Sequence, residues 1–309
     1  NLSTVQFLTA NYGFHYTQNL IKKVAEELKV HAQSKRILFQ TYENRFVFYW
    51  KDYQDKDELI AFTNDLSKIL EKIFITERIA TGLGVLEIEK NCDDDVDLLL
   101  KRVLIASERS LNFFEEGFKT YFYDTEMEAM VNRERQIREE LSLIATDNSD
   151  GKLYLQYQPI LEVKSNAICA FEALARLKTT TLGNVSPLEF IPIAEKTKLI
   201  IPIGEEVIRM SLQFLKKINE GRDEKVSVSI NISAIQLLKP DFVERLFILI
   251  AEAEVPLENI ALEITESIFA SNYKDINNIL STLKEKGIHI AIDDFGTGYS
   301  SLSREKELN

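Results

Sequence analysis

The second half of the chain alternates short apolar segments with longer amphipathic ones, and this alternation constrains the fold more than any other feature. The apolar segments lie at 153–160, 167–177, 226–233, 260–267 and 288–295. Segments with helical spacing of apolar residues precede the last three of them, at 205–218, 241–254 and 273–286. Strands that are apolar at nearly every position and alternate with helices are typical of buried parallel strands. The repeat predicts a (β/α)8 barrel, a fold of roughly 250 residues.

The first half reads as a separate α/β unit. Apolar spacing predicts helices at 19–30, 57–74 and 95–111, and strands at 79–88 and 119–124. The aromatic and β-branched stretch 36–50 has a polar centre, which predicts a hairpin. A charged amphipathic helix is expected over 125–145, followed by the turn-rich "TDNSDG". We therefore expect one domain at 1–125, a helical linker at 126–150 and a second domain at 151–309.

Composition excludes several classes of protein. The 309 residues are 45% apolar, too many for a disordered chain, and the net charge of −12 argues against a DNA or RNA partner. Cys92 and Cys169 stand in no CxxC or Cys/His cluster, which argues against a disulfide framework or structural zinc. With no apolar run of roughly 20 residues and no signal-peptide pattern, the chain is expected to be cytoplasmic without membrane contact.

Polar residues stand at the carboxyl ends of the predicted parallel strands, where the active sites of βα barrels lie. They are Glu172, Asn231, Glu263 with Glu266, and Asp293 with Asp294. Hard oxygen ligands that converge at such an edge suit Mg²⁺ or Mn²⁺ rather than zinc. Adjacent aspartates are suited to two ions roughly 3.5–4 Å apart, a geometry that promotes in-line attack on phosphorus.

Each of these residues also has a structural explanation. An acid at a strand end is often a helix cap or a solvated loop residue, although four in succession favour a site. Arg176 fits a substrate phosphate or a strand-end salt bridge equally well. "DFG" at 294–296 also occurs in protein kinases, but the chain has no Gly-rich loop and no HRD segment. "TGLG" at 81–84 opens no helix and is not a phosphate cradle.

Six ordered motifs resemble the EAL-domain family, whose members hydrolyse the bacterial second messenger cyclic di-GMP to the linear dinucleotide pGpG. They are "YQPI" (157–160), "EALAR" (172–176), "PLEFIPIAEKTKLIIPIG" (187–204), "INISAIQL" (230–237), "LEITES" (262–267) and "IDDFGTGYSSL" (292–302).

The resemblance implies a role for each matching position. Glu172, Asn231, Glu263 and Asp293 would hold a first Mg²⁺ or Mn²⁺, with Asp293 and Asp294 reaching a second. Glu266 would support this cluster. Gln158 and Arg176 would contact the dinucleotide. A homodimer through the barrel face near the loop after "DDFGTGYSS" is implied as well.

The chain departs from the family at its end. An EAL barrel continues past "YSSL" into a strand that carries a lysine, then a metal-binding glutamate. Residues 151–309 are too few for a complete barrel of roughly 250 residues. We therefore expect a portion of a longer protein, inactive by itself because the lysine that helps to activate water is missing.

The first domain resembles, more weakly, the GGDEF cyclase family, which often precedes EAL. "YENRF" (42–46) occupies the place of the GGDEF motif between two strands. Without its glycines the backbone could not approach a nucleotide phosphate, and Arg45 puts a positive charge where a carboxylate belongs. Gln33 stands where an inhibitory RxxD site would begin. This domain is expected to be a regulatory or structural module without cyclase activity.

Two functions of different classes follow. The first is a metal-dependent cyclic di-GMP phosphodiesterase in the parent protein. The alternative is a catalytically inert receptor for cyclic di-GMP, or a protein-interaction scaffold. Receptors in this family usually lose metal ligands, and every ligand position within this chain is intact, which favours the enzyme.

Overall fold

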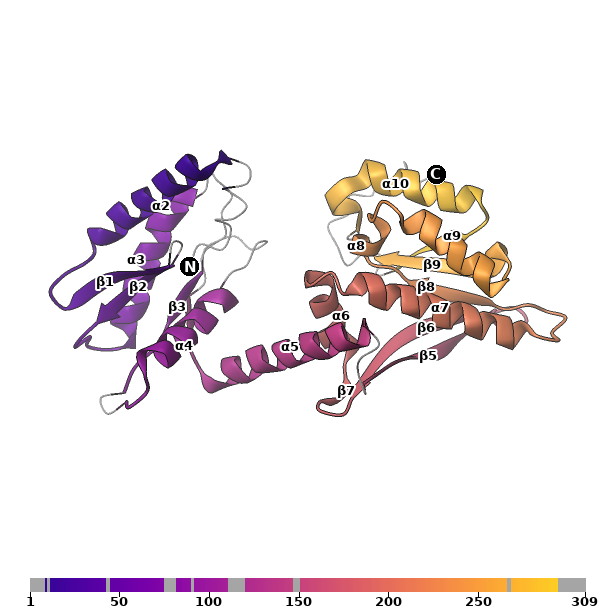
Figure 1. Cartoon of the computed structure of the whole chain (residues 1–309), viewed down its shortest axis with the longest axis horizontal. Helices are drawn as coiled ribbons and strands as arrows, with labels where there is room; N and C mark the ends of the chain where they lie inside the picture. Colours follow the sequence, from indigo (N-terminus) through magenta and orange to yellow (C-terminus); the bar gives the residue numbers. More distant parts are fainter. Residues whose placement is uncertain are drawn as a thin grey trace. The chain divides into compact units, whose positions relative to one another are not determined.

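The computed structural model describes residues 9, 12–42, 45–74, 82–89, 92–110, 120–146, 151–265 and 268–293. The chain divides into two compact units, Asn1–Asn132 and Arg133–Asn309 (Figure 1). The described residues contain no helix that is both long and apolar enough to span a bilayer.

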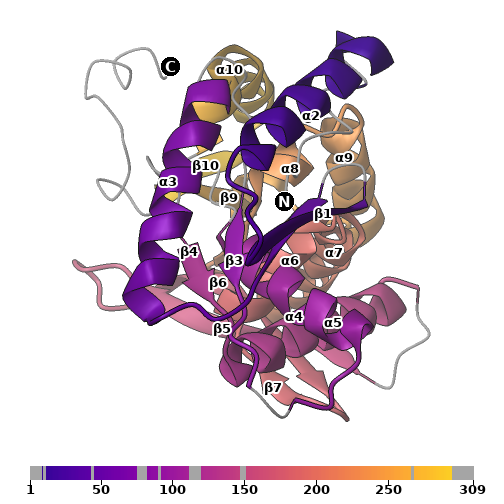
Figure 2. The same cartoon turned by 90° about the vertical axis from the view of Figure 1, so that its left-hand side faces the viewer.

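In the first unit, two helices pack on a hairpin. The helices are α2 (Phe14–Lys29) and α3 (Lys56–Phe74), and the hairpin strands are β1 (Arg36–Tyr42) and β2 (Arg45–Trp50) (Figures 1 and 2). Helix residues such as Val24 and Leu66 are buried against Leu38 and Phe48 of the hairpin. The predicted hairpin and both helices are confirmed, and α2 begins five residues earlier than expected.

A second sheet in this unit pairs β3 (Leu83–Val85) with β4 (Thr120–Phe122) in parallel, next to α4 (Val96–Arg109). The strand expected at 79–88 is limited to β3 within the described residues. A Cβ at Gly84 would lie 2.3 Å from the Ser107 nitrogen of α4. The absence of side chains at Gly82 and Gly84 of "TGLG" therefore lets α4 pack closely against this segment. This packing role agrees with the prediction that the segment is not a phosphate-binding loop.

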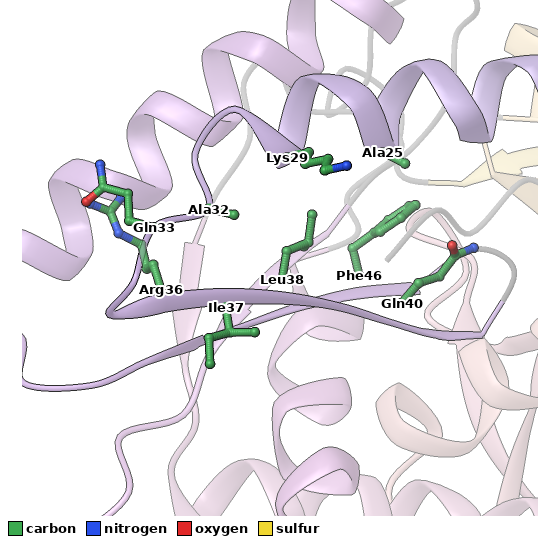
Figure 3. Close-up of a pocket in the computed structure, with 9 residues that line it drawn as sticks. All are labelled: Ala25, Lys29, Ala32, Gln33, Arg36, Ile37, Leu38, Gln40 and Phe46. Carbon is green, nitrogen blue, oxygen red and sulfur yellow. The ribbon is translucent and has the colours of Figure 1, made fainter.

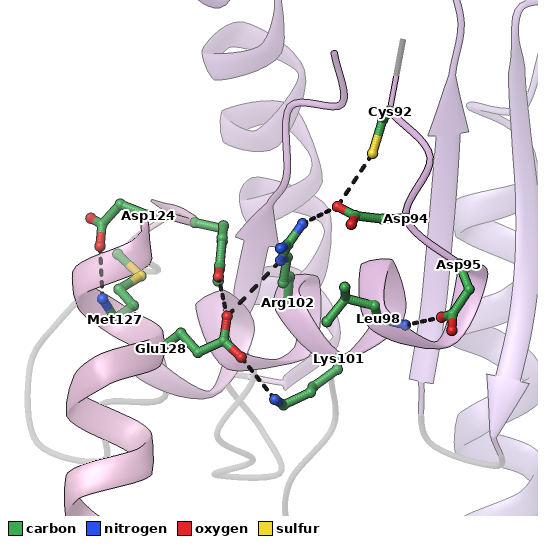
Figure 4. A network of polar contacts seen from close by, with 10 residues as sticks. Cys92, Asp94, Asp95, Leu98, Lys101, Arg102, Asp124, Met127 and Glu128 are labelled. Atoms are coloured by element: carbon green, nitrogen blue, oxygen red, sulfur yellow. Dashed lines mark hydrogen bonds and ion pairs between the residues drawn. The ribbon is translucent and has the colours of Figure 1, made fainter. Parts of the chain in front are cut away.

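A polar network ties α4 to the start of α5 (Thr125–Ile144) (Figure 4). Glu128 accepts hydrogen bonds from Lys101 Nζ at 2.8 Å and from the Tyr123 hydroxyl at 2.5 Å. Arg102 pairs with Asp94, which also accepts a hydrogen bond from Cys92 Sγ. Lys101 and Tyr123 lower the pKa of Glu128, so this carboxylate stays ionised at the first turn of the helix.

The later part of α5 belongs to the core of the second unit. Ile137 and Leu141 are buried with Phe190 and Leu177. Arg133 forms a bidentate ion pair with Glu189, at 2.5 and 3.1 Å. The predicted helix at 125–145 is therefore confirmed, and its residues from Arg133 onward pack within a folded unit.

One six-stranded sheet organises the second unit. Its strands are β5 (Lys152–Leu161), β6 (Ile168–Thr179), β7 (Gly183–Val185), β8 (Ser227–Asn231), β9 (Ile260–Thr265) and β10 (His289–Asp293). The order is β10-β9-β8-β6-β5, with β7 paired to β6. The predicted parallel arrangement is confirmed for β6, β8, β9 and β10. The described strands follow an open path, so barrel closure stays a prediction.

The expectation of a parallel first strand is wrong, because β5 runs antiparallel to β6. The loop between them spans only residues 162–167. Parallel neighbours need a crossover of a dozen or more residues, whereas a short loop forms a hairpin. The start of β5 therefore lies beside the carboxyl end of β6, with Tyr154 opposite Arg176.

Helices cover one face of this sheet. They are α6 (Pro187–Lys196), α7 (Ile200–Asn219), α8 (Ala234–Leu237), α9 (Phe242–Ala253) and α10 (Phe269–Glu285), with a short 3₁₀ turn η1 (Leu257–Asn259) before β9. Alternate strand residues, including Val228, Ile230, Leu262 and Ile264, are buried in a core with α7, α9 and α10. The residues between them point to the opposite face, because side chains alternate along a strand.

Gly204 permits the close approach of α7 and α8. A Cβ at this position would lie 1.9 Å from Nε2 of Gln236, a residue that is only 5% exposed. The Gln236 Oε1 accepts a hydrogen bond from the Ser233 N–H at 3.2 Å, just after β8. The amide is therefore held between the two helices and has little room to move.

We predict that Gly204→Ala lowers the free energy of unfolding by about 1–3 kcal/mol through overpacking. Urea denaturation measures this change. An alanine in a helix interior would otherwise add about 1 kcal/mol of stability. A variant as stable as the wild type would contradict the close packing, and pairing it with Gln236→Ala should recover part of the loss.

We also predict that the Arg133–Glu189 pair makes stability sensitive to acid. Hydrogen bonding to Arg133 lowers the pKa of Glu189 below its ordinary 4.5. Its contribution is therefore complete above about pH 4.5 and is lost as the pH falls through the lowered value. Since both side chains are about two-fifths exposed, Arg133→Met should cost about 0.5 kcal/mol at pH 7.

Chemical denaturation at pH 7 and pH 3 tests this, with Arg135→Met as the matched control. Arg135 lies on the same helix, 3.9 Å from Glu139, and both partners are more than half exposed. A loss for Arg133→Met that is equally large at both pH values would show that the ion pair is not its source.

Candidate functional site

The sheet brings the described candidate residues to one face. Gln158, Glu172, Arg176, Asn231, Glu263 and Asp293 all occupy strand positions between the residues that pack against the helices. Neighbours of each on its own strand, such as Tyr157, Ala173, Ile230, Leu262 and Ile292, contact the helical core. The candidate side chains therefore project to the side of the sheet away from the helices.

Strand register aligns these residues across the sheet. Gln158 lies opposite Glu172, and Asn231 lies opposite Glu263. Asp293 ends β10 beside Thr265, two residues beyond Glu263 on β9. The Asn231 Nδ2 donates a hydrogen bond to Glu172 Oε1 at 3.0 Å. The sheet thus joins residues that lie far apart in the sequence.

Electrostatics show that three carboxylates lie near one another. Burial raises the pKa of Glu263 most, and the negative charges of Glu172 and Asp293 raise it further. A hydrogen bond with Ser229 opposes this rise. Ser229 itself is buried, on the same face of β8 as Asn231. Like charges at such a site repel one another, and a bound cation relieves the repulsion.

The oxygen chemistry of this group fits a hard divalent cation. Three carboxylates and the Asn231 carbonyl oxygen are the donor types that Mg²⁺ and Mn²⁺ prefer. Two predicted site residues lie outside the described residues. They are Asp294, a predicted metal ligand, and Glu266, which is predicted to support the cluster. Within the described ranges, no three His, Cys, Asp or Glu side chains are spaced to enclose a metal ion.

Arg176 is held by a neutral partner. Its Nε donates to the Gln156 Oε1 at 2.7 Å, and its Nη1 donates to the Ala175 carbonyl at 2.9 Å. Among the residues the structure describes, Arg176 forms no ion pair. The strand-end salt bridge that the sequence left open is therefore not formed there, and the guanidinium charge is not neutralised by a described carboxylate.

Sequence reasoning missed Gln156 and Ser229. Gln156 lies two residues before Gln158 and hence on the same face of β5. Ser229 lies two residues before Asn231 on β8. The two-residue period of a strand was the available signal for both.

Tyr157 anchors the other face of β5. Its ring stacks on Phe214 with centroids 3.6 Å apart, and burial raises its pKa to about 12. The phenol donates a hydrogen bond to the Met210 carbonyl at 3.3 Å. Tyr157 therefore stays protonated at neutral pH and is a packing residue, which positions Gln156 and Gln158 on the opposite side.

The first unit carries an open pocket of about 480 Å³ between α2 and β1 (Figure 3). In Figure 3, Ala25 and Lys29 line it from α2, and Leu38, Gln40 and Phe46 line it from the hairpin. Arg36, at its rim, has its guanidinium 4.2 Å from the Trp50 ring centroid and 4.4 Å from that of Phe62. The Arg36 charge is thus placed over aromatic rings.

The hairpin between β1 and β2 contains the segment that was expected from sequence to correspond to the GGDEF motif. Tyr42 pairs with Arg45 across the hairpin, and the two residues between them, 43 and 44, lie outside the described ranges. Gln33, at the expected start of the RxxD site, lines the pocket and exchanges backbone hydrogen bonds with Arg36.

Comparison with known proteins points to one family. The EAL-domain family model matches residues 136–309. An uncharacterized protein of Synechocystis is 32% identical over 304 residues, which cover 97% of this chain and 43% of that protein. The cyclic di-GMP phosphodiesterase PA2567 of Pseudomonas aeruginosa is 32% identical over 228 residues, 74% of this chain and 38% of that protein.

A solved structure of the PaMucR phosphodiesterase in complex with c-di-GMP is 31% identical to the chain. The TM-score is 0.52, and the alignment covers 56% of this chain and 69% of that one. The chain spans less than half the length of the two curated relatives named above.

Proposed function

The chain belongs to the EAL-domain family, and from this premise we propose that its second unit hydrolyses cyclic di-GMP to the linear dinucleotide. The observation that carries the proposal is the gathering of the candidate residues on one face of the sheet. Glu172, Asn231 and Glu263 come from three adjacent parallel strands, and Asn231 is hydrogen-bonded to Glu172.

Four residues, Glu172, Asn231, Glu263 and Asp293, are proposed to hold a first Mg²⁺ or Mn²⁺ through their side-chain oxygens. Asp293 and Asp294 would reach a second ion, and Glu266 would support this cluster, as the sequence predicts. Such an ion, when bound, lowers the pKa of water to provide hydroxide and stabilises charge on a phosphate. The Asn231 Nδ2 group donates its hydrogen bond to Glu172. The side-chain oxygen of the same amide is therefore proposed as the atom that would coordinate a cation.

Gln158 and Arg176 are proposed to bind the dinucleotide. The guanidinium keeps its charge and has N–H groups beyond those used on Gln156 and Ala175, which suits a phosphate oxygen. Gln158 is exposed, opposite Glu172, where an amide would orient the substrate beside the carboxylates. Tyr157 is excluded as a base, because its pKa of about 12 keeps it protonated.

We predict that Glu172→Gln lowers cyclic di-GMP hydrolysis by at least about 100-fold, since loss of even an outer-shell partner of a metal costs about 10–100-fold. The assay uses the full-length protein with Mn²⁺ and chromatographic detection of the linear product. Glu224→Gln, in an exposed turn of the same unit, is the control and should retain full activity. A Glu172→Gln variant as active as this control would contradict the assignment.

The receptor alternative makes a different prediction for the same protein. A full-length wild type that binds cyclic di-GMP but forms no linear product would support a receptor or scaffold. The presence of every candidate ligand position within the chain favours the enzyme.

For the first unit we propose a GGDEF-like module without cyclase activity. The succession of helix, hairpin, helix and β3 supports the likeness, and Tyr42 paired with Arg45 replaces the motif. The boundary with the EAL domain is proposed to lie within α5 rather than at residue 151, since Ile137 and Leu141 pack in the second unit.

This module should form no cyclic di-GMP from GTP. The hairpin lacks the glycines that permit close backbone approach to a phosphate, and Arg45 repels metal ions. Incubation of the Glu172→Gln protein with GTP and Mg²⁺ tests this, because the product would accumulate without hydrolysis. Detectable cyclic di-GMP would overturn the assignment.

A further inference from the structure

The Arg176 guanidinium is oriented by one side chain from the neighbouring strand. Gln156 Oε1 accepts the Nε–H at 2.7 Å, and the Ala175 carbonyl accepts from Nη1. A guanidinium has five N–H donors in a rigid plane, so two bonds at its Nε and Nη1 fix the direction of the remaining donors. The bond to Gln156 is the only one of the two that depends on a side chain.

The antiparallel direction of β5 makes this contact available. Gln156 lies opposite Leu174 in the register, and Arg176 lies two residues further along β6. Diagonal neighbours in an antiparallel pair are within reach of long side chains. If β5 ran parallel to β6, this register would not exist.

We propose that Gln156 is a positioning residue that holds Arg176 for the phosphate of cyclic di-GMP. This inference rests on the proposed function. Gln156 neutralises no charge, so Arg176 remains a full cation for the ligand. A carboxylate at position 156 would hold the guanidinium more strongly but would cancel its charge, whereas the neutral amide of Gln156 leaves that charge for the ligand.

Removal of the Gln156 side chain should weaken the binding of cyclic di-GMP and leave the rate of the chemical step unchanged. Without Gln156 the Arg176 side chain samples several rotamers, and ordering it on binding costs affinity. Removal of an acceptor to a charged, exposed donor should weaken binding about three- to tenfold. Within the described residues no hydrogen bond joins Gln156 to a carboxylate of the site, so turnover of bound substrate should be unaffected.

The test compares Gln156→Met, Arg176→Ala and the double variant in the full-length protein. Methionine keeps the length of glutamine and removes the acceptor. We expect Gln156→Met to raise the KM for cyclic di-GMP about three- to tenfold with kcat within about twofold of the wild type. Calorimetric Kd values measured with a chelator should rise by the same factor.

The double variant separates positioning from a direct or merely structural role. If Gln156 acts through Arg176, the double variant will bind as weakly as Arg176→Ala alone. Gln213→Leu, at an exposed position on α7, is the control for a lost surface glutamine and should bind normally.

Three results would overturn the proposal. In the first, Gln156→Met binds as tightly as the wild type. In the second, its full effect persists in the Arg176→Ala background. In the third, the wild type fails to bind cyclic di-GMP at all, which would remove the proposed function together with this inference. The first two leave the phosphodiesterase proposal intact.

Discussion

The two-residue period of the strands is the constraint on which the second unit depends. Val228, Ile230, Leu262 and Ile264 are buried under helices, so the residues between them must face the other side. Ser229, Asn231 and Glu263 occupy those intermediate positions. A slip of one residue in register would expose the apolar set and bury the polar one, so the same packing that stabilises the fold also aligns the site.

The site places like charges close together at an energetic cost. Burial and the charges of Glu172 and Asp293 both disfavour ionisation of Glu263. Carboxylates perturbed by burial and by like charges gather at functional sites, which agrees with a functional role for this group. The Asn231 and Ser229 side chains each bond one of the carboxylates and offset part of this cost.

Much of this arrangement could be predicted from the sequence. Apolar runs located the strands of the second unit, and polar residues at their ends located the candidate site. The direction of β5 was missed because the pattern of an apolar strand does not reveal its direction, which depends on the six-residue loop at 162–167. The hydrogen bond between Gln156 and Arg176 depends on that direction, so it could not be predicted from the sequence either.

Helix α5 shows a similar limit of prediction from sequence. Its amphipathic pattern predicted α5, but a pattern does not identify the partner of an apolar face. Ile137 and Leu141 are buried with Phe190, a residue some 50 positions later in the chain, and so belong to the second unit. The first hairpin, in which Tyr42 pairs with Arg45, was predicted correctly because its aromatic and β-branched residues flank a polar centre.

We propose that the polar face of this sheet performs metal-dependent hydrolysis. The most direct measurement is the product formed when the full-length protein is incubated with cyclic di-GMP, with Mn²⁺ and with excess chelator in parallel. We expect the linear dinucleotide with Mn²⁺ and unchanged cyclic di-GMP with chelator. Equal product in both samples, or none with Mn²⁺ from a protein that binds cyclic di-GMP, would contradict this proposal.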